Sequence, residues 1–406
     1  KPYQFTIEDY ARAERMLAPS TFPLVSGTAG QATWLPDGRF WYRATTASGW
    51  DYILVNPAKP ARVSAFDKAK LAAALSSAAG GSYKADSLPF GGFAFANGGT
   101  AISVSVRGKP WTCDLAGKGC TAGKPAPVIP RDASLSPDSS TVAYIKDYNL
   151  WAKDLRTGTE TQLTTDGVKD FGYATNNAGW VHSDSPVLTW SDDSKHIATF
   201  QHDGRGVRDM VLGGTEPGHP RLEQWKYPLP GDSVVFSVQR VVINLGGGTP
   251  EVVRLKMAPD AHRSTVSDHI ACDDGNVCDL QWYPDGSHVA FISSSRDHRQ
   301  VWFRVADAVT GEVREVLHEE CKTQIGDASL TENLWKVLPA TNELIWWSER
   351  DNWIQLYLYD LRTGALKNRI TTGDGNVSRL VKVDEKARQI WFTAVGREPK
   401  SDPYFN

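Results

Sequence analysis

The stretch Asp154-Leu155-Arg156-Thr157-Gly158 occurs twice in the chain, since the same five residues return at Asp360–Gly364. A close variant, Asp-Ala-Val-Thr-Gly at Asp307–Gly311, precedes the second copy by about 50 residues. Each copy follows a strand-like run that ends in Asp, and its closing Gly is typical of a tight turn. A period of this length is typical of a β-propeller, in which each unit is a blade of four antiparallel strands.

A second turn signal recurs along the chain at multiples of about the same spacing. It reads Pro-Asp-Gly or Pro-Asp-Ser, once Asp-Asp-Ser, and it begins at Pro36, Pro137, Asp192 and Pro284. Weaker turn signals fill the intervals at 97–99, 246–248, 339–342 and 384–386. Eight units result, so the sequence predicts an all-β fold, an eight-bladed propeller of four-stranded antiparallel blades. Only two strand-like runs, 379–383 and 390–394, belong to the last unit, so we expect an incomplete last blade.

Two segments favour helices instead of strands. Thr6 and Asp9 have the spacing of a capping box, and apolar residues after them form one face of a short helix that ends before Pro19. A helical insertion is expected near 64–80, with the helix over 67–79, Ser64 as the candidate N-cap and Gly80 as the stop.

Composition excludes several classes of function. The net charge of the 406 residues is −3, and Lys and Arg form no stripe, so we expect no nucleic-acid partner. Apolar runs are too short for a membrane span. The nine His are scattered and form no metal-binding motif, so we expect no metal and no cofactor.

Four of the five cysteines form two local pairs. Cys113 and Cys120 flank one turn signal, and Cys272 and Cys278 flank another, so hairpin strands would bring each pair of sulfurs within bonding reach. Cys321 is left over. A zinc site is a weaker interpretation, because neither pair has zinc-knuckle spacing. Two local disulfides suit an oxidising compartment, so we expect a periplasmic or secreted protein.

Several longer strings then resemble a known family. They are 178–180 with 188–191, 197–200, 225–232, 348–353, 396–399 and 402–404. Together they resemble the N-terminal β-propeller of bacterial dipeptidyl peptidase IV-like serine peptidases, in the prolyl oligopeptidase clan. The resemblance covers almost the whole chain.

The resemblance implies a division of labour. In that family the propeller caps an α/β-hydrolase domain with a Ser-Asp-His triad, whose Ser stands in a Gly-x-Ser-x-Gly elbow. The chain contains no such elbow, because the nearest strings, at 80–84 and 231–235, lack the closing Gly. We therefore expect no catalytic residue here. Residues 1–24 would pack on a C-terminal hydrolase domain of the same polypeptide, 25–406 would form the propeller, and the natural chain would continue. Homodimers occur in that family, and the resemblance allows one here.

The resemblance also implies a substrate site. In the family a pair of Glu from the fourth blade binds the free α-amine of a peptide, because a buried ammonium needs paired carboxylates. Asn176 and Asn177 align with that pair, and neutral amides supply no charge. Asp184 could restore the charge, or it could be a solvated loop residue. A propeller Arg holds a substrate carbonyl in the family. The candidates, each of which could also be an ordinary surface residue, are Arg107, Arg205 and Arg208.

Two hypotheses about function follow. The first is a substrate-gating and substrate-binding propeller of a dipeptidyl peptidase IV-like serine exopeptidase that acts on short peptides. The second is a stand-alone periplasmic propeller that binds a peptide or protein partner without catalysis. The missing nucleophile and the Asn pair favour the second hypothesis. The incomplete last blade favours the first, because an open ring leaves an exposed strand edge.

Overall fold

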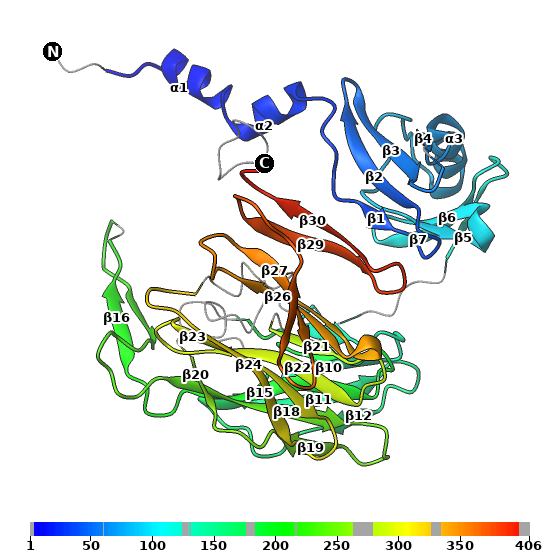
Figure 1. Ribbon diagram of the computed structural model, residues 1–406. Coiled ribbons are helices and arrows are strands. Elements are labelled where there is room, and N and C mark those ends of the chain that lie inside the picture. The colour runs from blue at the N-terminus through cyan, green and yellow to red at the C-terminus, as the bar shows by residue number, and fades with distance from the viewer. Residues whose placement is uncertain are drawn as a thin grey trace. The chain divides into compact units, whose positions relative to one another are not determined.

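The computed structural model describes residues 4–59, 61–123, 129, 131–175, 183–215, 217–262, 279–325 and 334–397. The chain forms two compact units, Lys1–Val128 and Ile129–Asn406 (Figure 1). Both consist mainly of antiparallel β-sheets. In the part of the chain that the structure describes, no helix is long and apolar enough to cross a lipid bilayer.

The first unit holds two four-stranded sheets in the orders β1-β2-β3-β4 and β5-β6-β7-β8. The strands of the first sheet are β1 (Thr33–Trp34), β2 (Phe40–Thr46), β3 (Gly49–Asn56) and β4 (Ala61–Ser64). Those of the second are β5 (Ala94–Ala96), β6 (Ala101–Val106), β7 (Lys109–Asp114) and β8 (Cys120–Ala122). Each sheet is a run of sequential strands, as expected of a propeller blade.

The helices lie close to the predicted positions. Helix α1 (Ile7–Glu14) begins with the capping box of Thr6 and Asp9. Pro19 does not end this helix but lies in the first turn of a short second one, α2 (Ala18–Thr21), where its missing N–H costs nothing. Helix α3 (Lys68–Ala79) ends at Gly80 in the left-handed conformation, as predicted.

The predicted cap of α3 is wrong. The carboxylate of Asp67, and not the hydroxyl of Ser64, accepts the backbone N–H groups of Ala69 and Lys70, each at 3.0 Å. Ser64 instead ends strand β4. An aspartate three residues closer to the helix offers a negative charge to its N-terminus, which a hydroxyl cannot do.

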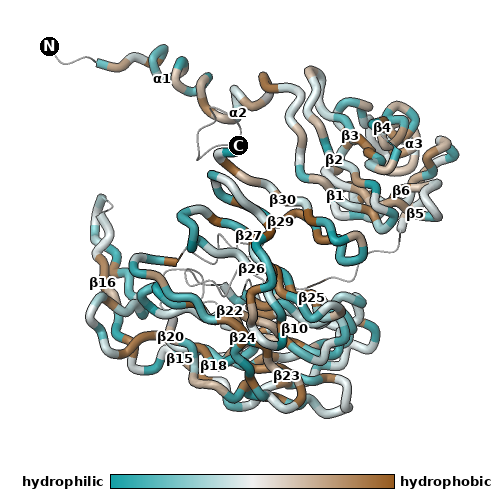
Figure 2. The backbone as a smooth tube through the Cα atoms, in the orientation of Figure 1, coloured by the Kyte–Doolittle hydropathy of each residue, from teal (hydrophilic) through white to brown (hydrophobic). Residues whose placement is uncertain are grey.

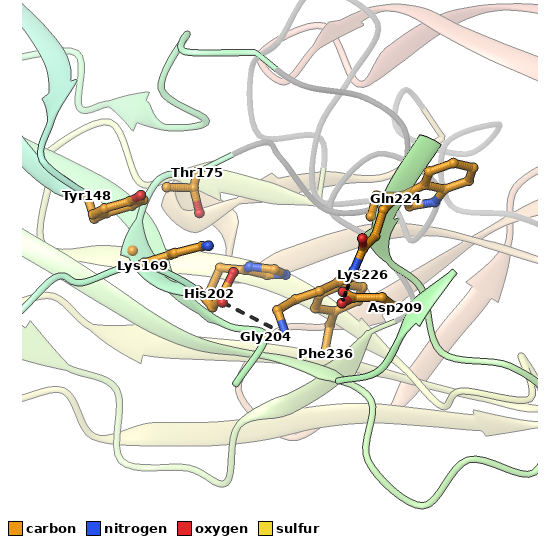
Figure 3. A pocket seen from close by; sticks show the side chains of 12 residues that line it. Tyr148, Lys169, Thr175, His202, Gly204, Asp209, Gln224, Lys226 and Phe236 are labelled. Atoms are coloured by element: carbon orange, nitrogen blue, oxygen red, sulfur yellow. Dashed lines mark hydrogen bonds and ion pairs between the residues drawn. The ribbon is translucent and has the colours of Figure 1, made fainter. Parts of the chain in front are cut away.

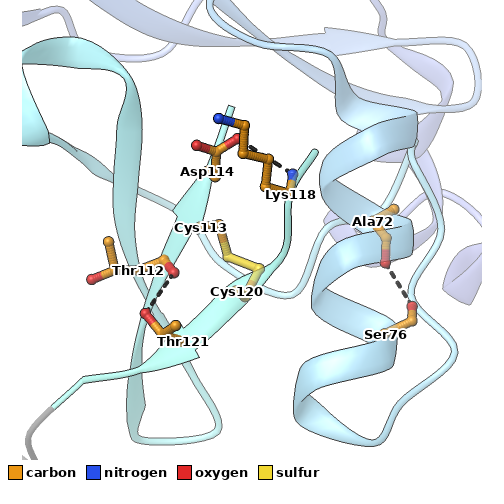
Figure 4. Close-up of a disulfide and its surroundings, with 8 residues drawn as sticks. All are labelled: Ala72, Ser76, Thr112, Cys113, Asp114, Lys118, Cys120 and Thr121. Carbon is orange, nitrogen blue, oxygen red and sulfur yellow. Dashed lines mark hydrogen bonds between the residues drawn. A yellow bond between two sulfur atoms is a disulfide. The ribbon is translucent and has the colours of Figure 1, made fainter. Parts of the chain in front are cut away.

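A disulfide joins the inner strand β7 to the edge strand β8, beside α3. Cys113 on β7 and Cys120 on β8 are opposite one another in the ladder, and their sulfur atoms are bonded (Figure 4). Cys113 is fully buried in the apolar cluster that also holds Leu71 and Leu75 of α3. Cys272 and Cys278 lie outside the described residues.

Among the described residues, the second unit contains four sheets of blade type and two two-stranded sheets. The first comprises β9 (Ala133–Leu135), β10 (Thr141–Lys146), β11 (Asn149–Asp154) and β12 (Glu160–Gln162). The next follows the path β13-β15-β18-β19, with β14 and β20 paired at its sides: β13 (Phe171–Tyr173), β14 (Thr189–Trp190), β15 (His196–Asp203), β18 (Phe236–Asn244), β19 (Glu251–Arg254) and β20 (Asp260–His262). A separate hairpin, β16 (Asp209–Gly213) with β17 (Leu222–Lys226), is inserted between β15 and β18.

Two further four-stranded sheets and one two-stranded sheet complete this unit. They are β21 (Leu280–Trp282), β22 (His288–Ser294), β23 (Gln300–Asp307) and β24 (Val313–Glu320); then β25 (Lys336–Leu338), β26 (Glu343–Ser348), β27 (Gln355–Asp360) and β28 (Leu366–Arg369); and last β29 (Val377–Asp384) with β30 (Gln389–Ala394).

The fold is thus an all-β propeller, but the predicted number of blades is wrong. The described residues form six blades of the four-stranded type, two in the first unit and four in the second, besides the pair β29–β30. The turn at 246–248 joins β18 to β19, in the same sheet as the β14–β15 turn at Asp192. These two signals mark two hairpins of one blade, because a turn signal reports a hairpin and each blade contains several.

Both repeated sequence signals are turns anchored by an aspartate. The Oδ1 atoms of Asp154, Asp307 and Asp360 each accept the backbone N–H groups two and three residues further on, at 2.7 to 3.1 Å. The glycines that close these turns have φ from +71° to +75°, which favours glycine. In the other signal, Asp138, Asp193 and Asp285 each accept the N–H two residues on, at 3.0 Å.

Apolar clusters fill the spaces between consecutive sheets. In the second unit one cluster joins β10–β11 to β15 and β18, a second joins β15 and β18 to β21–β23, and a third joins β22–β23 to β25–β27 and β29. The third contains Trp335, Trp346 and Trp347, all fully buried. Figure 2 shows the corresponding hydrophobic segments along these strands, with hydrophilic residues in most of the connecting turns.

A buried charge cluster links two neighbouring blades. Arg240 on β18 is 3% exposed and donates to Asp260 at 3.0 Å and to both carboxylate oxygens of Asp279, which precedes β21. It also donates to the carbonyl oxygen of Ile292 on β22 at 2.9 Å. Burial raises the pKa of Asp279, so this carboxylate depends on the guanidinium to stay ionised.

We predict that Arg240→Met lowers the free energy of unfolding by about 3–5 kcal/mol, because it leaves the buried carboxylate of Asp279 without a cation and leaves Asp260 only Arg304, at 3.6 Å. Arg254→Met is the matched control, since Arg254 pairs with Asp166 at 2.8 Å but both side chains are about half exposed. The control should cost at most about 1 kcal/mol. Urea unfolding measures both, and equal losses in the two variants would contradict a structural role for the buried cluster.

Candidate functional site

The turn between β10 and β11 has an unusual conformation. Lys146 pairs with Asn149 in the ladder, so Asp147 and Tyr148 alone form the turn, with φ of +51° and +65°. Two-residue turns of this kind usually contain glycine, and a tyrosine at positive φ is strained. Such strain persists only where the surroundings impose it, and it concentrates at functional sites.

The side chain of Asn149 holds this turn in place. Its amide donates to the carbonyl oxygens of Asp147 at 2.9 Å and Gly167 at 3.0 Å. Its Oδ1 accepts the N–H of Gly167 at 2.8 Å and the hydroxyl of Thr164 at 3.1 Å. Gly167 must be glycine, because a Cβ there would lie 2.2 Å from the carbonyl oxygen of Tyr148. The strained turn is therefore fixed by a buried, fully bonded amide.

An acidic groove lies beside this turn. It has a volume of about 660 Å³ and is lined by Asp132, Tyr144, Ile145, Asp147, Tyr148, Lys153, Glu160, Thr175, Ser183 and Asp184. Four of these residues are acidic and only one is basic. The blade β9–β12 supplies most of them, and the chain just after β13 and just before β14 supplies the rest.

The charges of the groove are unbalanced. Lys153 lies 3.3 Å from Glu160, so these two charges offset each other. Asp132, Asp147 and Asp184 have no ion-pair partner among the described residues. Burial, together with the carboxylate of Glu160, raises the pKa of Tyr144 to about 12, so this hydroxyl stays protonated at neutral pH. The groove therefore offers negative charge and hydroxyl groups, which suits a cationic ligand such as an amine.

A second pocket adjoins the groove. It has a volume of about 470 Å³ and lies between the strands β13, β15 and β18 and the hairpin β16–β17 (Figure 3). Tyr148 and Thr175 line both cavities. The other residues that line the pocket are Lys169, Asp170, Gly172, His202, Gly204, Asp209, Gln224, Trp225, Lys226 and Phe236.

His202 is the buried titratable group of this pocket. Its side chain is 3% exposed, its ring lies 4.9 Å from the ring of Phe236, and its Nε2 atom has no hydrogen-bond partner among the described residues. Burial lowers the pKa of His202 to about 4, so the imidazole is neutral at pH 7. No group of three or more His, Cys, Asp or Glu side chains in the described part of the chain is arranged to hold a metal ion.

The predicted site residues are not all brought together. Asp184 lines the acidic groove. Arg205 is bound to Asp203 through two nitrogen atoms and lies over the ring of Phe171, at 3.7 Å, and neither it nor Arg208 lines the groove or the pocket. Arg107 lies in the first unit, in the β6–β7 turn at φ +51°. Asn176 and Asn177 lie outside the described residues.

Sequence reasoning missed most of the residues that line the two cavities. Asp132 precedes β9, Asp147 lies in the β10–β11 turn and Glu160 begins β12, and no local motif marks them. The one available signal was the string Lys146-Asp-Tyr-Asn149, a two-residue turn without glycine between two strand-like runs. His202 gave no signal, because no motif surrounds it in strand β15.

Sheets of this pattern, with an acidic groove at a strained hairpin, define the protein as a β-propeller with a polar loop site. A family model described as the N-terminal region of dipeptidyl peptidase IV (DPP IV) matches residues 100–405. The chain belongs to this family, as the resemblance predicted, and is an N-terminal propeller region of dipeptidyl peptidase-like proteins.

Individual relatives agree with this assignment. Probable dipeptidyl-aminopeptidase B of Talaromyces stipitatus is 30% identical over 159 residues, which cover 37% of this chain and 17% of the fungal protein. The protein of the same name from Neosartorya fischeri is 26% identical over 215 residues, 48% of this chain and 21% of its own. The chain thus spans about a fifth of the curated relatives it matches.

A solved structure shows the same fold. The crystal structure of Porphyromonas gingivalis dipeptidyl peptidase 4 matches with a TM-score of 0.59 and 19% identity, over 98% of this chain and 52% of that one. At this level of identity the likeness concerns the fold alone. The chain spans about half the length of that protein.

We predict that His202 makes the protein less stable below neutral pH. The unfolded imidazole binds a proton near its usual pKa of 6.5, whereas the folded one does so only near 4. Stability is therefore lost as the pH falls through this range, by about 2 kcal/mol between pH 7 and pH 5. In His202→Phe the loss of stability that comes from protonation of this histidine should be absent. The control His219→Phe, at an exposed position, should show the same loss of stability as the unmodified chain. Denaturant unfolding at both pH values measures the difference, and an unchanged pH dependence in His202→Phe would refute it.

Proposed function

We propose that this chain is the substrate-binding and substrate-gating propeller of a dipeptidyl peptidase IV-like serine exopeptidase that acts on short peptides. Membership of the DPP IV N-terminal family supports the class. The observation that carries the binding role is the acidic groove, in which three carboxylates lack an ion-pair partner among the described residues. The free α-amine of a peptide is a cation that matches this charge.

Asp184 is the anchor that we assign to the amine. It is exposed in the groove, and it lies opposite no cation in the described part of the chain. Asp147 and Asp132 line the same cavity and add negative potential, while Tyr148 offers a hydroxyl acceptor. When a peptide is held by its terminal amine, a fixed number of its residues lies between the groove and any point further along the peptide. This geometry selects an exopeptidase substrate rather than an internal segment.

The rest of the enzyme is part of the same proposal. A C-terminal α/β-hydrolase domain of the same polypeptide supplies the nucleophile, and residues 1–24 pack on it. The exposed apolar side chains of this segment support such a contact, since Ile7 is 84% and Leu24 81% exposed. The remainder, 25–406, acts as the propeller.

We further propose a homodimer and an oxidising compartment, periplasmic or extracellular. The hairpin β16–β17 supports the dimer, because it carries the exposed apolar residues Val211, Leu212 and Leu222. The bond between Cys113 and Cys120 supports the compartment, because disulfides persist where thiols are not kept reduced.

The test compares tripeptides with free and acetylated N-termini as ligands of this chain, by isothermal titration calorimetry. We expect the free amine to bind more tightly, and Asp184→Asn to weaken it about tenfold, since a charge-assisted bond is lost. Asp184→Asn should leave the acetylated peptide unaffected. Asp192→Asn, an exposed aspartate of the β14–β15 turn outside both cavities, is the matched control. Equal affinity of the free and acetylated peptides for the unmodified chain would overturn the proposal.

A further inference from the structure

The pocket beside the acidic groove has a charge character of its own. Three of its charged groups already have partners. Lys226 donates to the carbonyl oxygen of Val207 at 2.9 Å and lies 3.8 Å from Asp170. Asp209 accepts the side-chain amide of Gln224 at 2.8 Å. Figure 3 shows the bond between Gln224 and Asp209 as a dashed line. Lys226 and Asp170 offset each other's charge, whereas Asp209 keeps its negative charge and is oriented by a neutral amide.

Lys169 is the remaining cation. Its ammonium group has no hydrogen-bond or ion-pair partner in the described ranges, and in Figure 3 it points toward the ring of His202. The turn that carries it is fixed, because the next residue, Asp170, has φ of +62° and accepts the N–H of Gly204 at 2.8 Å. Because this turn is fixed, the aliphatic part of the Lys169 side chain is held at the edge of the pocket.

His202 supplies a second unsatisfied group in the same pocket. Its Nε2 atom is buried and has no hydrogen-bond partner among the described residues. A neutral imidazole protonated at Nε2 donates one hydrogen bond without adding charge. A buried polar atom without a partner is unfavourable, so a ligand that accepts this bond is stabilised. An ammonium and an N–H donor facing one cavity together match a carboxylate.

The two cavities adjoin at Tyr148 and Thr175, which line both. One is rich in unpaired carboxylates, and the other contains the unpaired ammonium of Lys169. A single short peptide has one charge of each sign at its ends. The arrangement of the two cavities therefore matches both ends of such a molecule.

We propose that the pocket of Lys169 and His202 binds a carboxylate of the same peptide whose amine lies in the acidic groove. This inference rests on the proposed function and names a second determinant of its substrates. The carboxylate can come from the C-terminus of the peptide or from an acidic side chain. Lys169 forms the ion pair, and His202 donates through Nε2.

The experiment measures the dissociation constants of three peptides for the chain by calorimetry. They are Ala-Ala-Ala, its C-terminal amide, and Ala-Glu-Ala amide. We expect the amide of the first peptide to bind about tenfold more weakly than the free acid. Lys169→Met should weaken the free acid by a similar factor and leave the amide unchanged, so that the preference disappears. Recovery of affinity with Ala-Glu-Ala amide assigns the carboxylate to a side chain, and no recovery assigns it to the C-terminus.

Lys336→Met is the matched control, since Lys336 is an exposed lysine on β25 outside both cavities. It should keep the preference for the free acid. Two outcomes would overturn the inference: no preference of the unmodified chain for either carboxylate-bearing peptide over Ala-Ala-Ala amide, or a preference that survives Lys169→Met. The experiment distinguishes a failure of this inference from a failure of the proposed function. If N-acetylation weakens binding while amidation does not, the amine site stands and the carboxylate site falls.

Discussion

An aspartate carboxylate that accepts the backbone N–H groups of its own turn is the interaction on which the architecture depends. It occurs in both kinds of repeated turn, for example at Asp154 and Asp138. Each such turn reverses the chain within a few residues and sets the register of the strands on either side. Strands set in this way form a blade, and a blade has two apolar faces that it cannot bury alone. The clusters between consecutive sheets, with Trp346 and Trp347 at the centre of one, follow from that requirement.

The same constraint explains how far the sequence could predict the fold. Turns with a strong chemical signature, such as Asp360–Gly364, identified the class and the period correctly. The number of blades was wrong because turns within one blade resemble turns between blades: Asp192 and 246–248 belong to a single sheet. The hairpin β16–β17, inserted between β15 and β18, lengthened the segment of sequence that forms this blade, and no sequence signal marked the insertion. The helix cap was misplaced by three residues because Ser64 and Asp67 are both good N-cap residues, and only the backbone decides between them.

The site was harder to predict than the fold, for a physical reason. Asp147 and Asp184 are far apart in the sequence and meet because consecutive blades place their loops side by side. Alternation along a strand tells which residues are buried, but it does not tell which loops converge. Asp184 was named through the resemblance and its role stays a prediction, whereas the strained pair at 147–148 is recognised only from the φ angles of the structure. The role of the propeller Arg candidates stays a prediction; Arg205 is held by Asp203, and neither Arg205 nor Arg208 lines either cavity.

Strain, burial and charge at the site are connected. Asn149 uses its whole amide to impose a positive φ on Tyr148, and the same turn separates the carboxylates of the groove from the ammonium of Lys169. The rigidity of this turn is important, because opposite charges on flexible loops would pair with each other and would then be unavailable to a ligand. Here the turn is fixed by Asn149 and Gly167 on one side, and the Lys169 turn is fixed by Asp170 and Gly204 on the other. These conformations keep two opposite charges unpaired in two adjoining cavities. Such an arrangement favours a ligand with both charges at its ends over any internal segment of a folded protein.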